Sequence, residues 1–90
     1  MKRFSRYVKS GYDRYATWRK ANPQGFVVNE KADEWMLHAA SCSHLDHVKE
    51  LENRLVETPK SCSTDSSDLQ QYAESHDQTL VECRQCEPLR

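Results

Sequence analysis

Two short stretches of the chain carry residues with the types and spacing of metal ligands. The first is His-x3-Cys at His38 and Cys42, and the second is Cys-x2-Cys at Cys83 and Cys86. A Cys-x2-Cys pair forms a tight turn that aims two sulfur atoms at one point, and two more nitrogen or sulfur ligands complete a tetrahedral zinc site. We therefore expect the two half-sites to close one structural zinc centre that leaves no position open for a catalytic water.

Other Cys and His residues compete for the fourth ligand position. Cys62 is the main rival of His38, because four thiolates also make a sound zinc site; the simpler interpretation of Cys62 is a small buried residue within a strand. His44 and His47 lie in a polar segment, where histidines are commonly solvated, and His76 lies near a predicted helix end. The spacing favours His38 and leaves Cys62 open as an alternative.

The cysteines are expected to be reduced. The first seven residues contain no apolar h-region, and no apolar run reaches the roughly 18 residues of a membrane span, which predicts a cytoplasmic protein. In that reducing compartment cysteines more often bind metals than form disulfides. No third partner or oxyanion hole accompanies the Cys and His residues, so we expect no enzymatic activity.

Basic residues are concentrated in the first twenty positions. These hold seven Lys and Arg against one acidic residue, a net charge of +6, whereas the whole chain carries −1 and residues 21–90 therefore carry −7. Such a segment is typical of an element that contacts phosphates, although a solvated helix face has the same composition. The predicted nucleic-acid contacts are Lys2, Arg3, Arg6, Lys9, Arg14, Arg19 and Lys20.

The elements before the first half-site are a basic helix and a hairpin. Apolar residues at helical spacing predict a helix over residues 3–21, which ends before Pro23. Residues 1–22 are then a basic N-terminal segment packed on the domain or extending from it. Runs of β-branched and aromatic residues predict two short strands, 26–29 and 35–38, that pair as a hairpin.

The elements after the first half-site lead to the second. Residues 43–57 favour a short helix followed by a strand into Cys62, and a cluster of N-cap residues precedes a helix over 69–76. A last strand over 79–82 then delivers the final cysteine pair. We expect one α+β domain spanning residues 1–90, with a small antiparallel sheet, flanking helices, no parallel βαβ unit and one zinc as a staple.

The layout resembles a known family. His38-x3-Cys42 and Cys83-x2-Cys86, with a predicted helix shortly before the final pair, are similar to the zinc-binding N-terminal domain of the Ada DNA-repair protein and its relatives. The resemblance covers residues 35–87 and implies a zinc cofactor and a nucleic-acid partner, DNA more than RNA. In Ada the first ligand is a cysteine that accepts a methyl group, whereas the His here implies a structural clamp.

A second, looser resemblance concerns the remainder of the chain. The lead-in from Tyr15 to Asn29, with Leu37-His38 and Lys60-Ser61-Cys62, looks like small domains that accompany bacterial restriction-type nuclease modules. The leading hypothesis is thus a zinc-stabilised, non-catalytic nucleic-acid-binding module. The alternative is a protein-interaction adaptor or an inhibitor of a larger enzyme, of the kind borne by phages or plasmids, because the acidic body repels nucleic acid.

Overall fold

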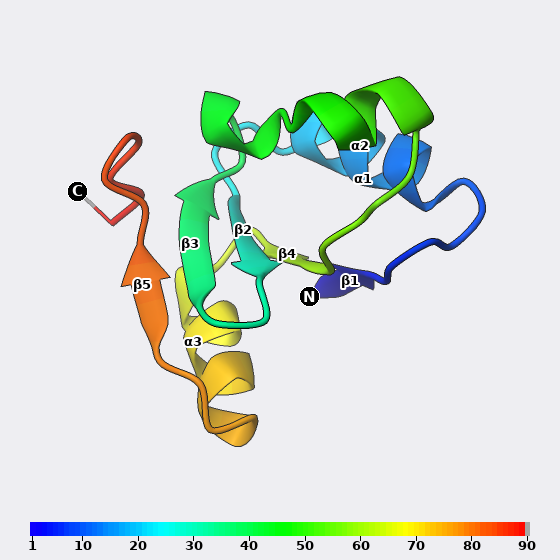
Figure 1. Ribbon diagram of the computed structural model, residues 1–90. Coiled ribbons are helices and arrows are strands. Elements are labelled where there is room, and N and C mark those ends of the chain that lie inside the picture. Colours follow the sequence, from blue (N-terminus) through cyan, green and yellow to red (C-terminus); the bar gives the residue numbers. More distant parts are fainter. Residues whose placement is uncertain (90) are drawn as a thin grey trace.

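The chain forms a five-stranded mixed sheet with helices on both faces. In the computed structural model, which describes residues 1–89, the elements are β1 (Lys2–Phe4), α1 (Gly11–Ala21), β2 (Phe26–Glu30), β3 (Trp35–Ala39), the 3-10 turn η1 (Ser43–Leu45), α2 (Val48–Asn53), β4 (Lys60–Ser63), α3 (Ser66–Ser75) and β5 (Leu80–Glu82) (Figure 1). Across the sheet the strands lie in the order β1–β4–β2–β3–β5. The α+β class is confirmed. Within the described residues no helix has the length and apolar character that a membrane crossing requires.

The predicted hairpin forms and supplies the centre of the sheet. β2 and β3 pair antiparallel with Val27 opposite His38, and β4 pairs with the other edge of β2. Because side chains alternate along a strand, Val27 and Val28 point to opposite faces and both are fully buried. The hairpin thus fixes which residues reach each face, and it puts His38 on the same face as Val27.

The sheet is mixed rather than wholly antiparallel, because β5 runs parallel to β3. The chain leaves β4, crosses one face of the sheet as α3, and re-enters at the far edge. A helical crossover returns the chain to its starting end, so the next strand runs in the same direction as the one before the helix. The expectation that no parallel βαβ unit exists is therefore wrong for β4–α3–β5.

The N-terminal helix is shorter than the sequence predicts. Residues 2–4 form the edge strand β1, paired with β4, and α1 begins only at Gly11. Tyr7 and Ser10 have positive φ angles of 57° and 64°, which a right-handed helix excludes. The Tyr7 backbone N–H donates instead to the carbonyl of Val56, at 2.9 Å. The helix ends at Ala21, as expected.

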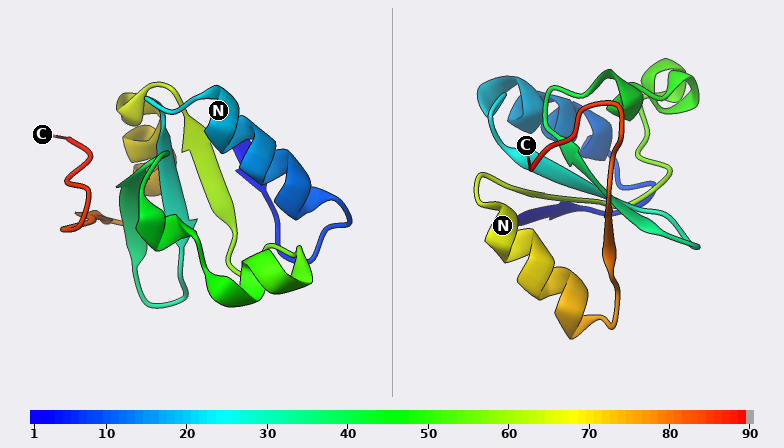
Figure 2. Two further views of the ribbon diagram at one scale, coloured as in Figure 1. Left: turned by 90° about the horizontal axis from the view of Figure 1, so that it is seen from above. Right: turned by 90° about the vertical axis from the view of Figure 1, so that its left-hand side faces the viewer.

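Each face of the sheet has its own core. Figure 2 shows α1 and α2 over one face and α3 over the other. The α1 face buries Tyr12, Tyr15, Val27, Ala40, Cys42, Leu45, Val56, Cys62 and Cys83. The α3 face buries Val28, Leu37 and Leu69, with Phe26, Trp35 and Leu80 packed against them. Three of the four cysteines are therefore part of the core beneath α1.

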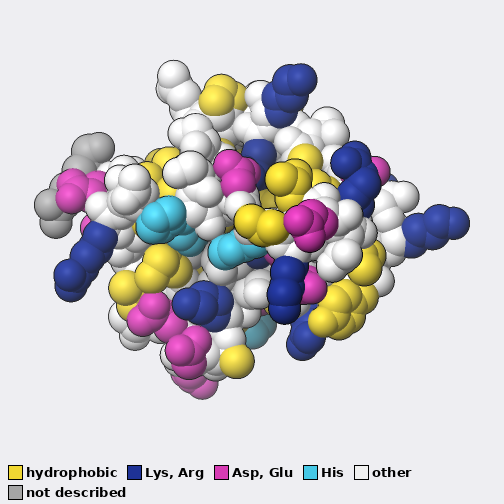
Figure 3. All heavy atoms as spheres, turned by 45° about the horizontal axis from the view of Figure 1, so that its top comes forward, with side chains coloured by type: hydrophobic (Ala, Val, Ile, Leu, Met, Phe, Trp, Pro, Cys, Tyr) yellow, Lys and Arg dark blue, Asp and Glu magenta, His cyan; other side chains and the backbone are white. Residues whose placement is uncertain are grey.

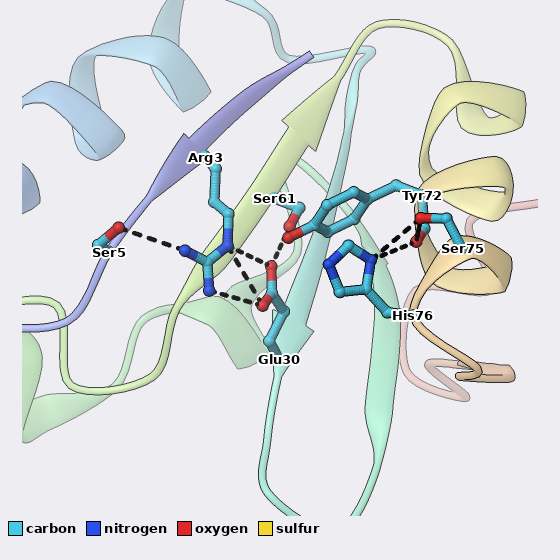
Figure 4. Close-up of polar contacts among 7 residues, drawn as sticks. All are labelled: Arg3, Ser5, Glu30, Ser61, Tyr72, Ser75 and His76. Atoms are coloured by element: carbon cyan, nitrogen blue, oxygen red, sulfur yellow. Dashed lines mark hydrogen bonds and ion pairs between the residues drawn. The ribbon is translucent and has the colours of Figure 1, made fainter.

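A polar network and an aromatic stack complete the α3 face. The Glu30 carboxylate accepts hydrogen bonds from Arg3, at 3.0 Å from Nη2 to Oε1, and from the buried hydroxyl of Ser61 (Figure 4). Beside this network the Tyr72 ring stacks on Trp35 with a centroid distance of 5.6 Å, and His76 lies against both rings. The network joins β1 and β4 to β2, and the aromatic stack joins β3 to α3.

Candidate metal centre

The structure brings the two predicted half-sites together. One ligand atom from each of His38, Cys42, Cys83 and Cys86 lies within 4.8 Å of the other three, and only Cys86 is more than slightly exposed. His38 projects from β3, Cys42 follows that strand, and the other two follow β5. Three cysteines and one histidine arranged in this way could hold a metal ion.

The parallel pairing of β3 with β5 is what aligns the half-sites. Leu37 is paired with Glu82, so the residue after each lies at the same end of the sheet, and the Cys83 backbone N–H donates to the Leu37 carbonyl at 2.9 Å. The Ala39 N–H then donates to the Cys86 sulfur at 3.3 Å. A backbone donor of this kind stabilises a thiolate. The crossover that the sequence did not reveal therefore builds the site.

The local geometry fits a tetrahedral ion. A zinc–sulfur distance of about 2.3 Å in a tetrahedral site separates two sulfurs by roughly 3.8 Å, and the Cys42 and Cys83 sulfurs lie 3.9 Å apart. The Nδ1 atom of His38 is buried without a hydrogen-bond partner. Since buried polar atoms are normally satisfied, this nitrogen is the atom that a bound cation would explain.

Burial sets the protonation of the site in the absence of a cation. Burial, with help from the positive charges of Lys60 and Arg19 among nearby groups, lowers the pKa of His38 to about 4, so the imidazole is neutral as a metal ligand requires. Burial raises the pKa of Cys42 to about 12. Burial opposes ionisation of Cys83 as well, but backbone N–H groups of Cys86 and Gln85 bring its pKa below the ordinary value. A metal cation would offset the cost of ionising Cys42.

Arg19 forms hydrogen bonds to the loop that carries Cys42. Its guanidinium donates to the carbonyls of Ala40 and Cys42, at 2.7 and 3.0 Å, and to the Asp46 carboxylate at 2.8 Å. Two carbonyls on either side of a short turn are thus held by one rigid fork. The sequence predicted that Arg19 contacts phosphate, and that prediction rested only on its positive charge. The structure gives this side chain an internal role beside the metal centre.

The alternative ligands lie outside the group of four. Cys62 is fully buried in β4 on the same face, but Val27 stands between it and His38 in the row of paired residues. Two strand spacings place Cys62 and His38 roughly 10 Å apart. The Nδ1 atom of His44 lies 3.9 Å from the Cys83 sulfur, outside the group of four. His76 belongs to the aromatic stack under α3.

The seven predicted nucleic-acid contacts separate into two groups. Arg3 and Arg19 are held by Glu30 and Asp46, respectively. The other five are exposed and form no ion pair within residues 1–89: Lys2, Arg6, Lys9, Arg14 and Lys20. Of these, Arg6 donates to the Tyr7 hydroxyl and lies over its ring. The structure therefore leaves part of the basic segment available on the surface.

A groove separates β1 from the outer side of α1. It has a volume of about 770 Å³ and is lined in part by Lys2, Phe4, Arg14 and Trp18. A basic groove with an aromatic wall has the chemistry to accept a phosphate backbone and a stacked base.

No protein-family model matches the chain, and comparisons with curated proteins and with solved structures give no significant match, so the evidence for a function lies in the geometry of the chain itself.

Proposed function

We propose that the four-residue centre is a structural zinc site. Three thiolates and one imidazole are a common structural zinc ligand set, and four protein ligands leave no position for a reactive water. The buried, unpartnered Nδ1 of His38 supports this assignment best. The proposed role is to join the loop after β3 to the turn after β5, which makes the site a staple of the fold and leaves recognition to the surface.

The zinc proposal is tested by metal content. Elemental analysis of protein purified without added metal should give about one zinc per chain. His38→Ala should lose that zinc, whereas Cys62→Ala is a matched control in the same core and should retain it. Retention by His38→Ala together with loss by Cys62→Ala would reassign the fourth ligand and refute the proposed set.

We propose further that the domain is a non-catalytic module that binds nucleic acid, DNA in the first place. The groove between β1 and α1 carries this proposal, because it combines the cations Lys2 and Arg14 with the half-buried ring of Trp18. Cations along such a groove neutralise phosphates and release counterions, and an aromatic ring offers a stacking surface to any base. The Ada-like layout of the metal ligands is consistent with the same partner.

The charge distribution supports an oriented mode of binding. The first twenty residues carry +6 and the remainder −7, so a polyanion is attracted to the groove side and repelled by the acidic elements. Asp13, which also lines the groove, is held by Arg54 at 2.6 Å. Its charge is therefore partly neutralised, and Lys2 and Arg14 dominate this surface.

A salt titration with duplex DNA tests this proposal. Affinity should fall with salt by roughly 0.9 log units per log unit of salt for each phosphate neutralised. Lys2→Ala and Arg14→Ala should each reduce that slope by about one contact. Lys49→Ala, which removes an exposed lysine from α2, should leave it unchanged. Equal losses in all three variants, or no binding at low salt, would refute the groove as the interface.

One observation favours the alternative of a protein-interaction module. Val48 and Leu51 lie three positions apart on α2 and are 66% and 51% exposed, so they form an apolar stripe at the surface. An adaptor or an inhibitor of a larger enzyme would use such a stripe. In this case a partner should survive nuclease treatment, and Leu51→Asp should release it while Lys49→Ala should not.

A further inference from the structure

A second polar pocket lies beside the metal centre, on the α1 face of the sheet. It has a volume of about 470 Å³, within the roughly 300–1,000 Å³ of small-molecule sites. Its polar lining includes Asn29, Lys31, His38, His44, His47 and Thr58. Figure 3 shows histidine side chains coming to the surface close together on this side of the molecule. None of these residues belongs to the groove between β1 and α1.

The lining of the pocket combines several hydrogen-bond donors with one lysine. The one carboxylate in its lining, Asp46, is bound to Arg19 at 2.8 Å. The nearest buried carboxylate, Glu50, is paired with Lys60, whose ammonium lies 3.3 Å from it. Lys31 is exposed at the rim, and no ion pair engages it within residues 1–89. Lys31 therefore gives the pocket one positive charge without a counter-charge, although the body of the chain is acidic.

His38 connects this pocket with the metal centre. Its Nδ1 is buried without a hydrogen-bond partner, while the residue also lines the pocket. If Nδ1 is the metal ligand, the proton of the neutral ring is on Nε2, and this nitrogen can only donate. A metal bound at Nδ1 would therefore fix the tautomer of His38 and make Nε2 a hydrogen-bond donor. His44 and His47 also line the pocket and are exposed, and the Nδ1 atom of His44 lies 3.9 Å from the Cys83 sulfur.

We propose that this pocket binds a phosphate group, with Lys31, His47 and the metal-bound His38 as its donors. Phosphate oxygens accept several hydrogen bonds at once, and each charge-assisted bond is about twice as strong as a neutral one. Asn29 and Thr58 supply further polar atoms on the wall. The phosphate comes either from a small molecule or from the 5′ end of a nucleic acid. The inference rests on the proposed zinc site through His38, and it is independent of the groove, because the two sites share no residue.

Calorimetry on the metal-loaded full chain tests the pocket. Inorganic phosphate, with chloride at equal ionic strength as the reference, should bind with a saturable isotherm. Lys31→Ala and His47→Gln should each weaken it about tenfold, as the loss of one charge-assisted hydrogen bond does. Lys49→Ala is the matched lysine control and should bind like the parent chain. All variants should retain the same metal content, which separates loss of the pocket from loss of the fold.

A second titration identifies the source of the phosphate. Short oligonucleotides with a 5′-phosphate and with a 5′-hydroxyl are compared at a salt concentration that suppresses backbone binding. A preference for the phosphorylated end that disappears in His47→Gln assigns the pocket to nucleic-acid ends, whereas saturation by inorganic phosphate alone assigns it to a small molecule. If neither probe saturates, or if Lys31→Ala and His47→Gln bind like the parent chain, the proposal is wrong.

Discussion

The two faces of the sheet are stabilised by different kinds of interaction. Beneath α3 the core consists of Val28, Leu37 and Leu69, closed by an aromatic stack and one network around Glu30. Beneath α1 the core contains three thiols and several buried polar groups, among them a fully buried Lys60. Apolar side chains gain free energy by burial alone, whereas thiols and charges need a partner. We therefore expect the α3 face to support itself and the α1 face to depend on the proposed metal and on matched charges.

The buried ion pair beneath α1 illustrates that dependence. Lys60 contacts Asn29 at 2.6 Å and Glu50 at 3.3 Å, while Glu50 also accepts hydrogen bonds from the backbone of residues 57 and 58. Desolvation lowers the pKa of Lys60 despite the attraction of Glu50. Such a pair costs more to break than it contributes when intact. It fixes the position of α2 relative to the sheet rather than adding much net stability.

Removal of the proposed metal should have the largest effect on stability, and it acts on the α1 face. The apparent binding free energy of a structural zinc in small domains is about 10–16 kcal/mol, more than a domain of this size has to spare. A chelator should therefore unfold the chain, and circular dichroism should show recovery when zinc is returned. Acid should do the same, because protons compete with the metal for three thiolates. A melting curve unchanged by the chelator would show that the α1 face does not need a metal.

The next largest effect tests the α3 face. Leu69 is fully buried, and Leu69→Ala should cost about 2–5 kcal/mol in unfolding free energy, because a cavity replaces its side chain. Zinc content should stay at one per chain, since Leu69 packs on the opposite face of the sheet from the four proposed ligands. Val81→Ala on β5, a 40% exposed position, is the control and should change stability little. Loss of zinc from Leu69→Ala would mean that the two faces are not separable.

Arg19 should have an intermediate effect that is confined to the metal. Arg19→Met keeps the length of the side chain and removes the fork that holds the Ala40 and Cys42 carbonyls. Residues that orient ligands from outside typically contribute 10–100-fold in metal affinity, and we expect a loss in that range in a competition assay with a chelating dye. Lys20→Met, the adjacent exposed position of α1, is the control. Equal metal affinities for the two variants would show that Arg19 does not support the metal centre.

The smallest effect concerns the aromatic stack. Tyr72→Leu keeps apolar bulk over Trp35 but removes the ring pair, which should reduce the unfolding free energy by about 1 kcal/mol. Denaturant unfolding of the zinc-loaded chain measures it. Tyr7→Leu, at a 57% exposed tyrosine, should have no comparable effect. A similar loss in both variants would show that the stack contributes no more than a surface tyrosine.

Local patterns in the sequence predicted local structure well. The hairpin of β2 and β3, the strand into Cys62 and the helix before β5 all follow from short-range periodicity and from turn or cap residues, and each is confirmed. The four residues of the candidate metal centre were predicted for the same reason, since each half-site is a local spacing. What no local pattern contains is the pairing of residues far apart in the chain.

The wrong predictions share one cause, which is contact between residues far apart in the chain. Phe4, Tyr7 and Val8 keep helical spacing, yet residues 2–4 pair with β4, almost sixty positions away, and that pairing decides their conformation. The parallel placement of β5 also depends on where α3 lies, which no short window reveals. The role of Arg19 depends on carbonyls of a distant loop, so its charge was read as a surface property.

The separation of the two half-sites has a consequence for the rate of assembly. Cys42 and Cys83 are 41 positions apart, and their sulfurs meet only after β4, α3 and β5 have taken their places. Closing a loop of that length before other contacts form costs conformational entropy and slows folding. The Cys-x2-Cys turn can capture an ion early, but the full ligand set has to wait for the crossover. We therefore expect metal uptake to proceed in two phases, the slower of which reports the arrival of β5 at the edge of the sheet.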